Sequence, residues 1–140
     1  MRLWHKDLIQ VLPRKQLLGQ WRECCLIAKN IKEKGTPGHI LVNRILNYSE
    51  EHFLGYCICI FNEIKKRNYR ADWNRLNKHI CSATKPKYYA AIFCFWHDDI
   101  YLRQCLYNLE EKAMCGGISK DEWNIIVDRY GEKFDLWRGL

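Results

Sequence analysis

The feature that most constrains the fold is a long amphipathic segment bounded by Pro13 and Gly35. Proline suits the first position of a helix, because its missing N–H would have no acceptor there, and glycine commonly follows a helix C-terminus. At about 100° per residue, the apolar side chains of the segment fall on one side. This predicted core face consists of Leu17, Leu18, Trp21, Cys24, Cys25, Ala28 and Ile31. The pattern predicts a single long helix with one buried face.

Helix-start signals recur along the rest of the chain. Ser49 precedes two acids, and Ser119 with Glu122 forms a capping box. Both patterns are typical of helix N-termini, where side-chain oxygens accept from free N–H groups and acids suit the helix dipole. Asp98 marks another helix start, and that helix is expected to end near Gly116. The chain therefore has helical periodicity over most of its length.

These elements predict an all-α fold of five or six helices, forming one compact domain over residues 1–140. Short helices are expected over residues 39–46 and 72–80. The longest apolar run, residues 88–96, is interpreted as a buried strand or as part of a core helix. It is too short to cross a bilayer, which takes about 20 apolar residues in a helix.

The first ten residues do not resemble a secretory signal peptide. They carry charges within their apolar stretch and lack a small-residue cleavage site. Without a membrane-spanning run either, the protein is expected to be cytoplasmic and to have no membrane partner. We also expect it to be a monomer.

The eight cysteines are not spaced for zinc, because no CxxC pair occurs. Most lie among apolar neighbours and are expected in the core: Cys24, Cys25, Cys57, Cys59, Cys94 and Cys105. His97 and the two acids after it could bind a metal, but a helix start with acids in its first turn explains them better. No metal site is predicted.

The net charge of +7 is concentrated in one half of the chain. Residues 1–70 contain 13 Lys or Arg and 6 Asp or Glu, whereas residues 71–140 contain 10 of each. Such asymmetry favours a polyanion-binding face, with nucleic acid the commonest partner. Lys15, Arg22 and Lys29 are spaced by seven and form a stripe suited to a phosphate backbone. A solvated surface without a partner is the alternative.

Glu23 is the only acid between Asp7 and Glu33. It lies opposite the predicted core face, one turn after Gly19. A glycine in a helix interior lowers helix stability by about 1 kcal/mol relative to alanine, so the presence of Gly19 needs a reason. Close approach of another backbone or of a ligand would explain this glycine. Leu26 and Ile27 are also expected to face away from the core, so the segment 3–12 could pack there. That packing would bring the N-terminal amine towards Glu23, unless Glu23 is an ordinary surface charge.

The first helix resembles that of the phage-type pyrimidine-dimer DNA glycosylases, small all-α enzymes that excise UV-damaged bases. The similarity is ungapped through this helix and includes Leu12, Leu17, Trp21 and above all Arg22-Glu23. Weaker similarity follows at EIKKRNY (residues 63–69), LEEK (109–112) and RYG (129–131). In that family the N-terminal amine attacks deoxyribose C1′ to form a Schiff base, and a glutamate about twenty residues on is essential.

The resemblance implies specific roles for several residues here. Glu23 takes the place of the catalytic glutamate, and Arg22 that of a phosphate-contacting arginine. The phage-type enzymes begin Met-Thr and expose the threonine amine, whereas the bulky Arg2 is expected to leave Met1 in place as the reactive amine. The DNA-contacting set also differs, because family cations are replaced at Leu3 and Leu26. The chain therefore looks like a divergent bacterial-type branch.

The implied function is a DNA glycosylase with associated abasic-site (AP) lyase activity on damaged, pyrimidine-dimer-like duplex DNA or on abasic sites. Met1 and Glu23 would be catalytic, and no metal or organic cofactor would be needed. The DNA-binding residues would be Arg2, Lys15, Arg22 and Lys29. Two alternatives remain open: a non-catalytic helical module that binds nucleic acid, and a protein-interaction domain whose basic face meets an acidic partner.

Overall fold

Every regular element in the computed structural model, which describes residues 1–139, is helical. The prediction of an all-α fold with five or six helices is confirmed, since five α-helices occur in this part of the chain. The α-helices are α1 (Arg14–Lys34), α2 (Glu50–Lys66), α3 (Asn74–Asn77), α4 (Asp99–Met114) and α5 (Lys120–Phe134). Three short 3₁₀ helices accompany them: η1 (Lys6–Val11), η2 (Asn43–Asn47) and η3 (Tyr89–Ala91).

The first helix begins and ends where the sequence predicts. Pro13 occupies the N-cap of α1. Gly35 follows the helix with a left-handed backbone (φ 76°), and its N–H donates to Ile31 O at 2.9 Å. Most of the predicted core face is buried, with Leu18 and Ile31 half-buried at its edges.

Ile27 is completely buried, so the expectation that it faces away from the core is wrong. The chain after Gly35 folds back along this side of α1, where Asn30 Nδ2 donates to Pro37 O at 3.4 Å. The buried arc of α1 is therefore wider than the sequence periodicity indicates. Leu26 remains exposed, as expected.

The later helix starts also lie at the predicted capping residues. Ser119 Oγ accepts from Glu122 N at 3.2 Å, and Asp98 Oδ1 accepts from Tyr101 N at 2.8 Å. Ser49 occupies the N-cap of α2, although its side chain makes no capping hydrogen bond. Asp98 is thus explained by its capping role.

Residues 88–96 form neither a strand nor a core helix, so both interpretations of this segment are wrong. Apart from η3 it consists of turns, and Phe93 and Phe95 have left-handed backbone (φ 49° and 73°), which interrupts helical and extended conformations alike. Phe93 is fully buried, whereas Phe95 is 90% exposed. Cys94 is also exposed, contrary to the expectation of a core position.

Two further short helices are smaller than predicted. Within residues 39–46, only the part from Asn43 onward is helical, as η2. Within residues 72–80, the helix is confined to α3, and Asp72 Oδ1 accepts from Asn74 N at 2.9 Å. Both lie in loops where turns replace the expected helical residues.

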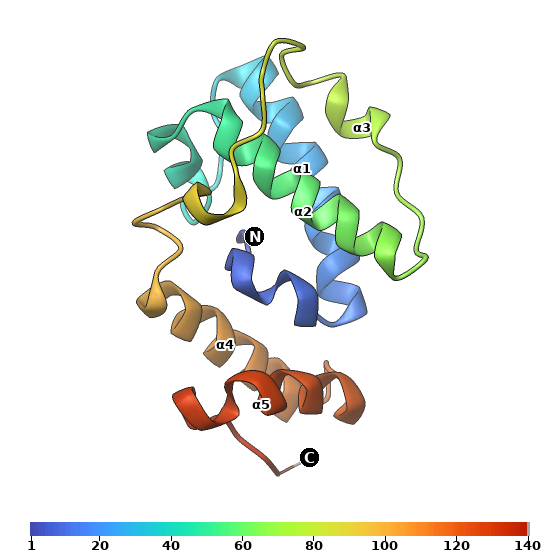
Figure 1. Cartoon of the computed structure of the whole chain (residues 1–140), viewed down its shortest axis with the longest axis vertical. Coiled ribbons are helices and arrows are strands. Elements are labelled where there is room, and N and C mark those ends of the chain that lie inside the picture. The colour runs from blue at the N-terminus through green and yellow to red at the C-terminus, as the bar shows by residue number, and fades with distance from the viewer. Residues whose placement is uncertain (140) are drawn as a thin grey trace.

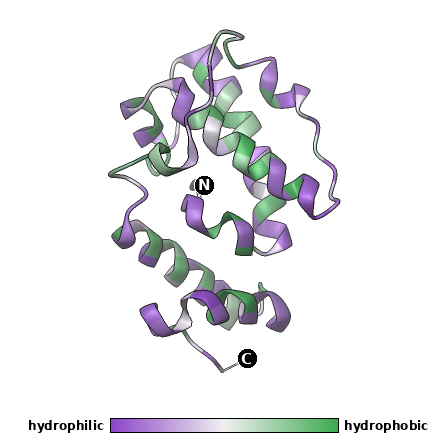
Figure 2. Ribbon diagram, in the orientation of Figure 1, coloured by the Kyte–Doolittle hydropathy of each residue, from purple (hydrophilic) through white to green (hydrophobic). Residues whose placement is uncertain are grey.

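The helices are arranged in two groups around the N-terminal segment. α1 packs against α2 and α3 in one group, and α4 packs against α5 in the other. The N-terminus lies between the two groups (Figure 1), and η1 contacts both α2 and α5. α2 carries a long hydrophobic stretch, whereas α3 is hydrophilic (Figure 2). The N-terminal segment is therefore a central part of the core.

No helix in residues 1–139 combines the length and the apolar character that a bilayer span requires. All eight cysteines are free thiols. Those that lie in the core, as expected, are Cys24, Cys25, Cys57 and Cys105.

Candidate active site

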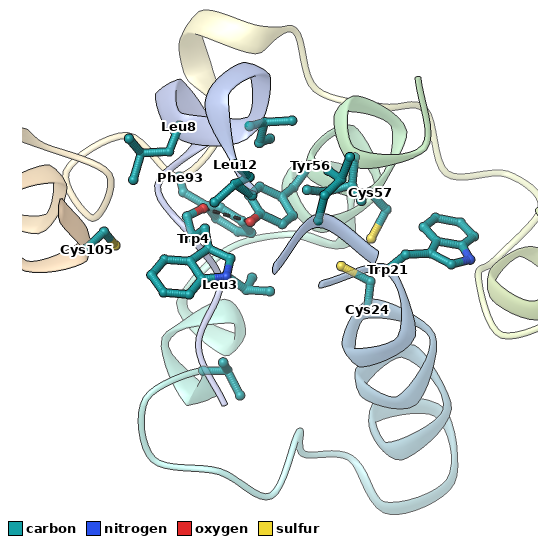
Figure 3. Close-up of a cluster of buried hydrophobic side chains, with 14 of the residues drawn as sticks. Leu3, Trp4, Leu8, Leu12, Trp21, Cys24, Tyr56, Cys57, Phe93 and Cys105 are labelled. Carbon is teal, nitrogen blue, oxygen red and sulfur yellow. Dashed lines mark hydrogen bonds between the residues drawn. The ribbon is translucent and has the colours of Figure 1, made fainter. Parts of the chain in front are cut away.

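The first residues of the chain are held in place by side chains from three helices. Trp4 N donates to Gln20 Oε1 of α1 at 2.7 Å. The Tyr56 hydroxyl of α2 donates to Trp4 O at 2.7 Å (Figure 3), and the Tyr101 hydroxyl of α4 donates to Leu3 O. Chain termini are usually mobile unless they are tied down in this way. The backbone of residues 2–4 is therefore held in place, directly next to the N-terminal residue.

Gln20 connects this segment to the predicted catalytic carboxylate. Its Nε2 donates to Arg2 O at 3.0 Å and to Glu23 Oε2 at 3.2 Å, and its Oε1 lies 3.0 Å from the Tyr56 hydroxyl oxygen. The side chain is only 1% exposed. Both amide N–H donors of Gln20 are thus used, and its oxygen accepts from Trp4 N. One buried amide fixes the N-terminal backbone and Glu23 relative to each other.

Met1 and Glu23 line the same cleft, which has a volume of about 260 Å³. Packing of the N-terminal segment beside Glu23 is what the sequence predicts. The remaining residues that line this cleft are Arg2, Trp4, Leu41, Asn108 and Lys112. An amine and a carboxylate thus share one small, partly enclosed space.

The electrostatics of the cleft act on Glu23 in two directions. Burial raises the pKa of the Glu23 carboxyl, because desolvation disfavours its charged form. The N-terminal amine, His39 and Arg22 lower the pKa electrostatically, as does the hydrogen bond from Gln20, and together they offset part of this effect. A partly desolvated carboxylate beside an amine is a suitable proton acceptor and donor.

Arg2 is directed towards the interior of the protein. Its Nη1 donates to Cys105 Sγ at 3.7 Å, and its guanidinium carbon lies 5.7 Å from the centre of the Trp4 ring. These contacts hold the Arg2 side chain half-buried at the base of the cleft. A DNA-binding role for Arg2 would be limited to groups that enter the cleft.

The three cations of the predicted stripe, Lys15, Arg22 and Lys29, are all exposed along α1. None of them has a carboxylate within 4.0 Å in the part of the chain that the structure describes. Arg22 also lines a basic cleft of about 560 Å³ with three further cations: Lys65, Arg70 and Arg75. The basic surface of α1 therefore continues towards α3.

Gly19 has a different environment from the one expected. A methyl group at this position would meet only Arg22 Nη2, at 3.8 Å, which is an ordinary contact. The expectation that another backbone packs closely against Gly19 is therefore wrong, since the space above it is open. Glycine is not required there by the protein's own packing.

Three residues of the cleft region were not identified from the sequence. Gln20 lies three residues after Leu17 and four before Cys24, which places it on the buried face of the helix. This spacing could have predicted a buried amide that needs hydrogen-bond partners. Asn108 and Lys112 are one turn apart on α4. The LEEK similarity was the only sequence signal for Lys112, and it gives no indication that α4 faces Glu23.

No group of three His, Cys, Asp or Glu side chains is placed to hold a metal ion within residues 1–139. The chemical groups available in the cleft are an amine, a carboxylate, an amide and two cationic side chains. These groups are suited to nucleophilic attack and proton transfer at an anionic substrate.

The site thus combines an all-helical fold, an N-terminal segment held by buried hydrogen bonds and an exposed basic helix. A sequence model of the family described as pyrimidine dimer DNA glycosylase matches residues 1–77, more than half of the 140 residues. The chain belongs to this family. No curated protein and no solved structure matches it.

Proposed function

We propose that the protein is a DNA glycosylase with associated AP lyase activity that acts on pyrimidine-dimer-like lesions and abasic sites in duplex DNA. In this proposal the amine of Met1 is the nucleophile and Glu23 is the acid–base residue. The observation that carries the proposal is the single cleft lined by both groups, with the N-terminal backbone fixed by Gln20, Tyr56 and Tyr101.

The first step replaces the damaged base by the enzyme's amine. The neutral amine attacks C1′ of the deoxyribose, and the C1′–N bond breaks so that the base leaves with the electron pair. Glu23 accepts a proton from the attached nitrogen. It then donates that proton to the ring oxygen O4′ as the C1′–O4′ bond opens. The product is a protonated imine between the N-terminus and C1′.

The second step cleaves the strand. The Glu23 carboxylate removes a proton from C2′, the C3′–O3′ bond breaks, and the 3′ phosphate leaves with the bonding electrons. Water then hydrolyses the imine and releases the amine. Partial desolvation of Glu23 suits both steps, because a carboxyl with a raised pKa donates and accepts protons nearer to neutral pH.

The basic residues of α1 provide the contacts with the DNA backbone in this proposal. Lys15, Arg22 and Lys29 are exposed, unpaired with carboxylates and aligned along one helix flank. Lys112 contributes a further positive charge at the cleft itself, where a phosphate next to the lesion would lie. These contacts would supply affinity that falls steeply with salt.

Borohydride trapping tests the proposal directly. A duplex oligonucleotide with one abasic site, or with one thymine dimer, is incubated with the protein and borohydride, which reduces the imine to a stable covalent bond. We expect a protein–DNA adduct, and mass spectrometry of the digested adduct should locate the DNA on the N-terminal peptide that contains Met1. An absence of adduct would contradict the lyase mechanism, and an adduct on a lysine side chain would contradict the role of the N-terminal amine.

The matched variants for this experiment are Glu23→Gln and Glu33→Gln. Both residues are acids of α1, but Glu33 is exposed and does not line the cleft. Glu23→Gln should lower turnover by about 10²- to 10⁴-fold, as expected for loss of an acid–base residue, while DNA affinity stays similar or increases. Glu33→Gln should keep native turnover. Equal turnover of the two variants would remove Glu23 from the mechanism.

A further inference from the structure

The loop between α1 and η2 exposes two large aliphatic side chains. Ile40 is 83% exposed and Leu41 is 49% exposed. The loop is ordered by its own hydrogen bonds, with Gly38 N donating to Thr36 Oγ1 at 3.1 Å and Leu41 N donating to His39 Nδ1 at 3.3 Å. A structured loop that presents apolar side chains to solvent is typical of an interaction surface.

This apolar tip lies at the edge of the candidate active site. Leu41 lines the cleft that contains Met1 and Glu23. His39, its near neighbour, is close enough to influence the pKa of Glu23 electrostatically. Leu26, which is 46% exposed, lies one turn after Glu23 on α1. Exposed apolar side chains therefore lie in and next to the lining of the candidate cleft.

The same region is rich in cations. Lys29, Lys32 and Lys34 lie on the last turns of α1, and Arg44 follows the loop in η2, where all four are exposed. The Arg44 guanidinium also stacks on the Trp96 ring, at 5.4 Å. An apolar tip surrounded by positive charge suits DNA, because cations contact phosphates while apolar side chains contact the faces of unstacked bases.

We infer that Ile40 and Leu41 form an apolar wedge that enters the base stack beside the lesion. This inference rests on the proposed function. The wedge fills the space that opens when the duplex kinks at the damaged step, and it thereby holds C1′ of the damaged nucleotide within reach of the Met1 amine. Unstacking a base step costs a few kcal/mol, which apolar side chains inserted between bases help to offset.

The test compares duplex with single-stranded substrates, since only a duplex needs to be opened. The variants are Ile40→Ser and the double variant I40S/L41S, and the control is Ile125→Ser, a 54% exposed isoleucine on α5 away from the cleft. Ile40 is so exposed that its substitution should leave the fold intact, which circular dichroism would verify. Single-turnover rates are measured on an abasic site in duplex DNA and in the same oligonucleotide as a single strand.

We expect the double variant to lose about 10- to 100-fold in rate on the duplex. A tenfold loss in rate corresponds to about 1.4 kcal/mol, so this range is comparable to the few kcal/mol that opening a base step costs. Ile40, unlike Leu41, does not line the cleft, so Ile40→Ser should lose rate on the duplex but stay within about twofold of native on the single strand. Ile125→Ser should match the native protein on both. A 2-aminopurine base opposite the abasic site should also fluoresce less with the double variant than with native protein.

Two outcomes would overturn the wedge. If duplex and single-strand rates fell equally, the loop would only shape the cleft. If neither rate changed in an active protein, the tip would have another partner. Failure of the native protein to form an adduct with any substrate would instead overturn the proposed function, so the two failures are distinguishable.

Discussion

At the scale of single residues, the partial burial of Glu23 that suits the proposed chemistry also costs stability. Burial raises its pKa in the folded state, so the charged form destabilises the fold relative to the protonated form. The stabilising contribution of this group is present below its unfolded pKa and is lost as the pH rises through the folded pKa. At pH 8 the Glu23→Gln variant should therefore have a higher urea midpoint of unfolding than the native protein. At pH 4 the difference between the two midpoints should be smaller. An equal difference at both pH values would contradict this account.

Gln20 is predicted to act as a positioning residue for the same reaction. Gln20→Leu removes the hydrogen bond that lowers the Glu23 pKa and the donor to Arg2 O. We expect kcat to fall by about 10²-fold, since small displacements of reacting groups have effects of that size. The acid limb of the pH–rate profile should also move to higher pH, which a general loss of stability would not cause. Gln104→Leu, at an exposed position on α4, should leave both unchanged.

The sequence indicates part of this site. The charge pattern singles out Glu23, and helical periodicity suggests that segment 3–12 could pack beside it. The pairing of Glu23 with the N-terminal amine as reacting groups comes from the family resemblance. Lys112 could not be predicted, because it meets Glu23 only across the cleft between the two helix groups, about which local patterns say nothing. The orientation of Arg2 towards Cys105 depends on the same packing.

At the scale of elements, local capping signals predict helix starts well, while segments organised by distant contacts are missed. α1, α4 and α5 begin where proline or capping side chains indicate. Residues 88–96 depend instead on Lys6, whose ammonium donates to the carbonyl oxygens of Tyr89, Ala90 and Ile92 at 2.9, 3.2 and 2.9 Å. More than eighty residues separate these groups, so no local pattern could show the contact.

Lys6→Met tests the importance of this buried cation. The substitution leaves three carbonyl oxygens without their donor, of which Ile92 O is buried and the other two are partly accessible to water. An unsatisfied buried polar group costs about 1–3 kcal/mol before relaxation. We expect the free energy of unfolding, measured in urea, to fall by about 2–4 kcal/mol. Lys66→Met, at an exposed position near the end of α2, should change it by less than about 0.5 kcal/mol. A similar small effect for Lys6→Met would show that residues 88–96 hold their conformation without it.

At the scale of the whole molecule, the uneven charge predicts salt-dependent binding to undamaged duplex DNA. Each lysine that contacts a phosphate contributes about 0.9 to the slope of log affinity against log salt. Lys15→Gln and Lys29→Gln should each lower the slope by about that amount, whereas Lys120→Gln on α5 should not. Fluorescence anisotropy across a salt series would measure the slopes. Equal slopes for all three variants would mean that the stripe on α1 does not contact DNA.

Three buried or half-buried histidines make the stability of the whole fold depend on pH. Burial lowers the pKa of His5 and His52, and it lowers the pKa of His97 to about 2, helped by the nearby charges of His5 and Lys6. His97 Nδ1 accepts from Lys6 N at 3.0 Å, which requires the neutral ring. A group whose folded pKa lies below its unfolded pKa stabilises the fold above the unfolded value, and this contribution is lost as the pH falls.

His97 alone should therefore lower the free energy of unfolding by about 2 kcal/mol between pH 7.5 and pH 5, because the unfolded chain binds a proton near pH 6.5 that the folded protein does not bind. Urea titrations at half-unit pH intervals would measure this slope. His97→Gln keeps an acceptor for Lys6 N and has no titrating ring, so its profile should be flatter over the same range even if the variant is less stable at pH 7.5. A variant slope equal to that of the native protein would show that protonation of His97 does not limit stability in acid.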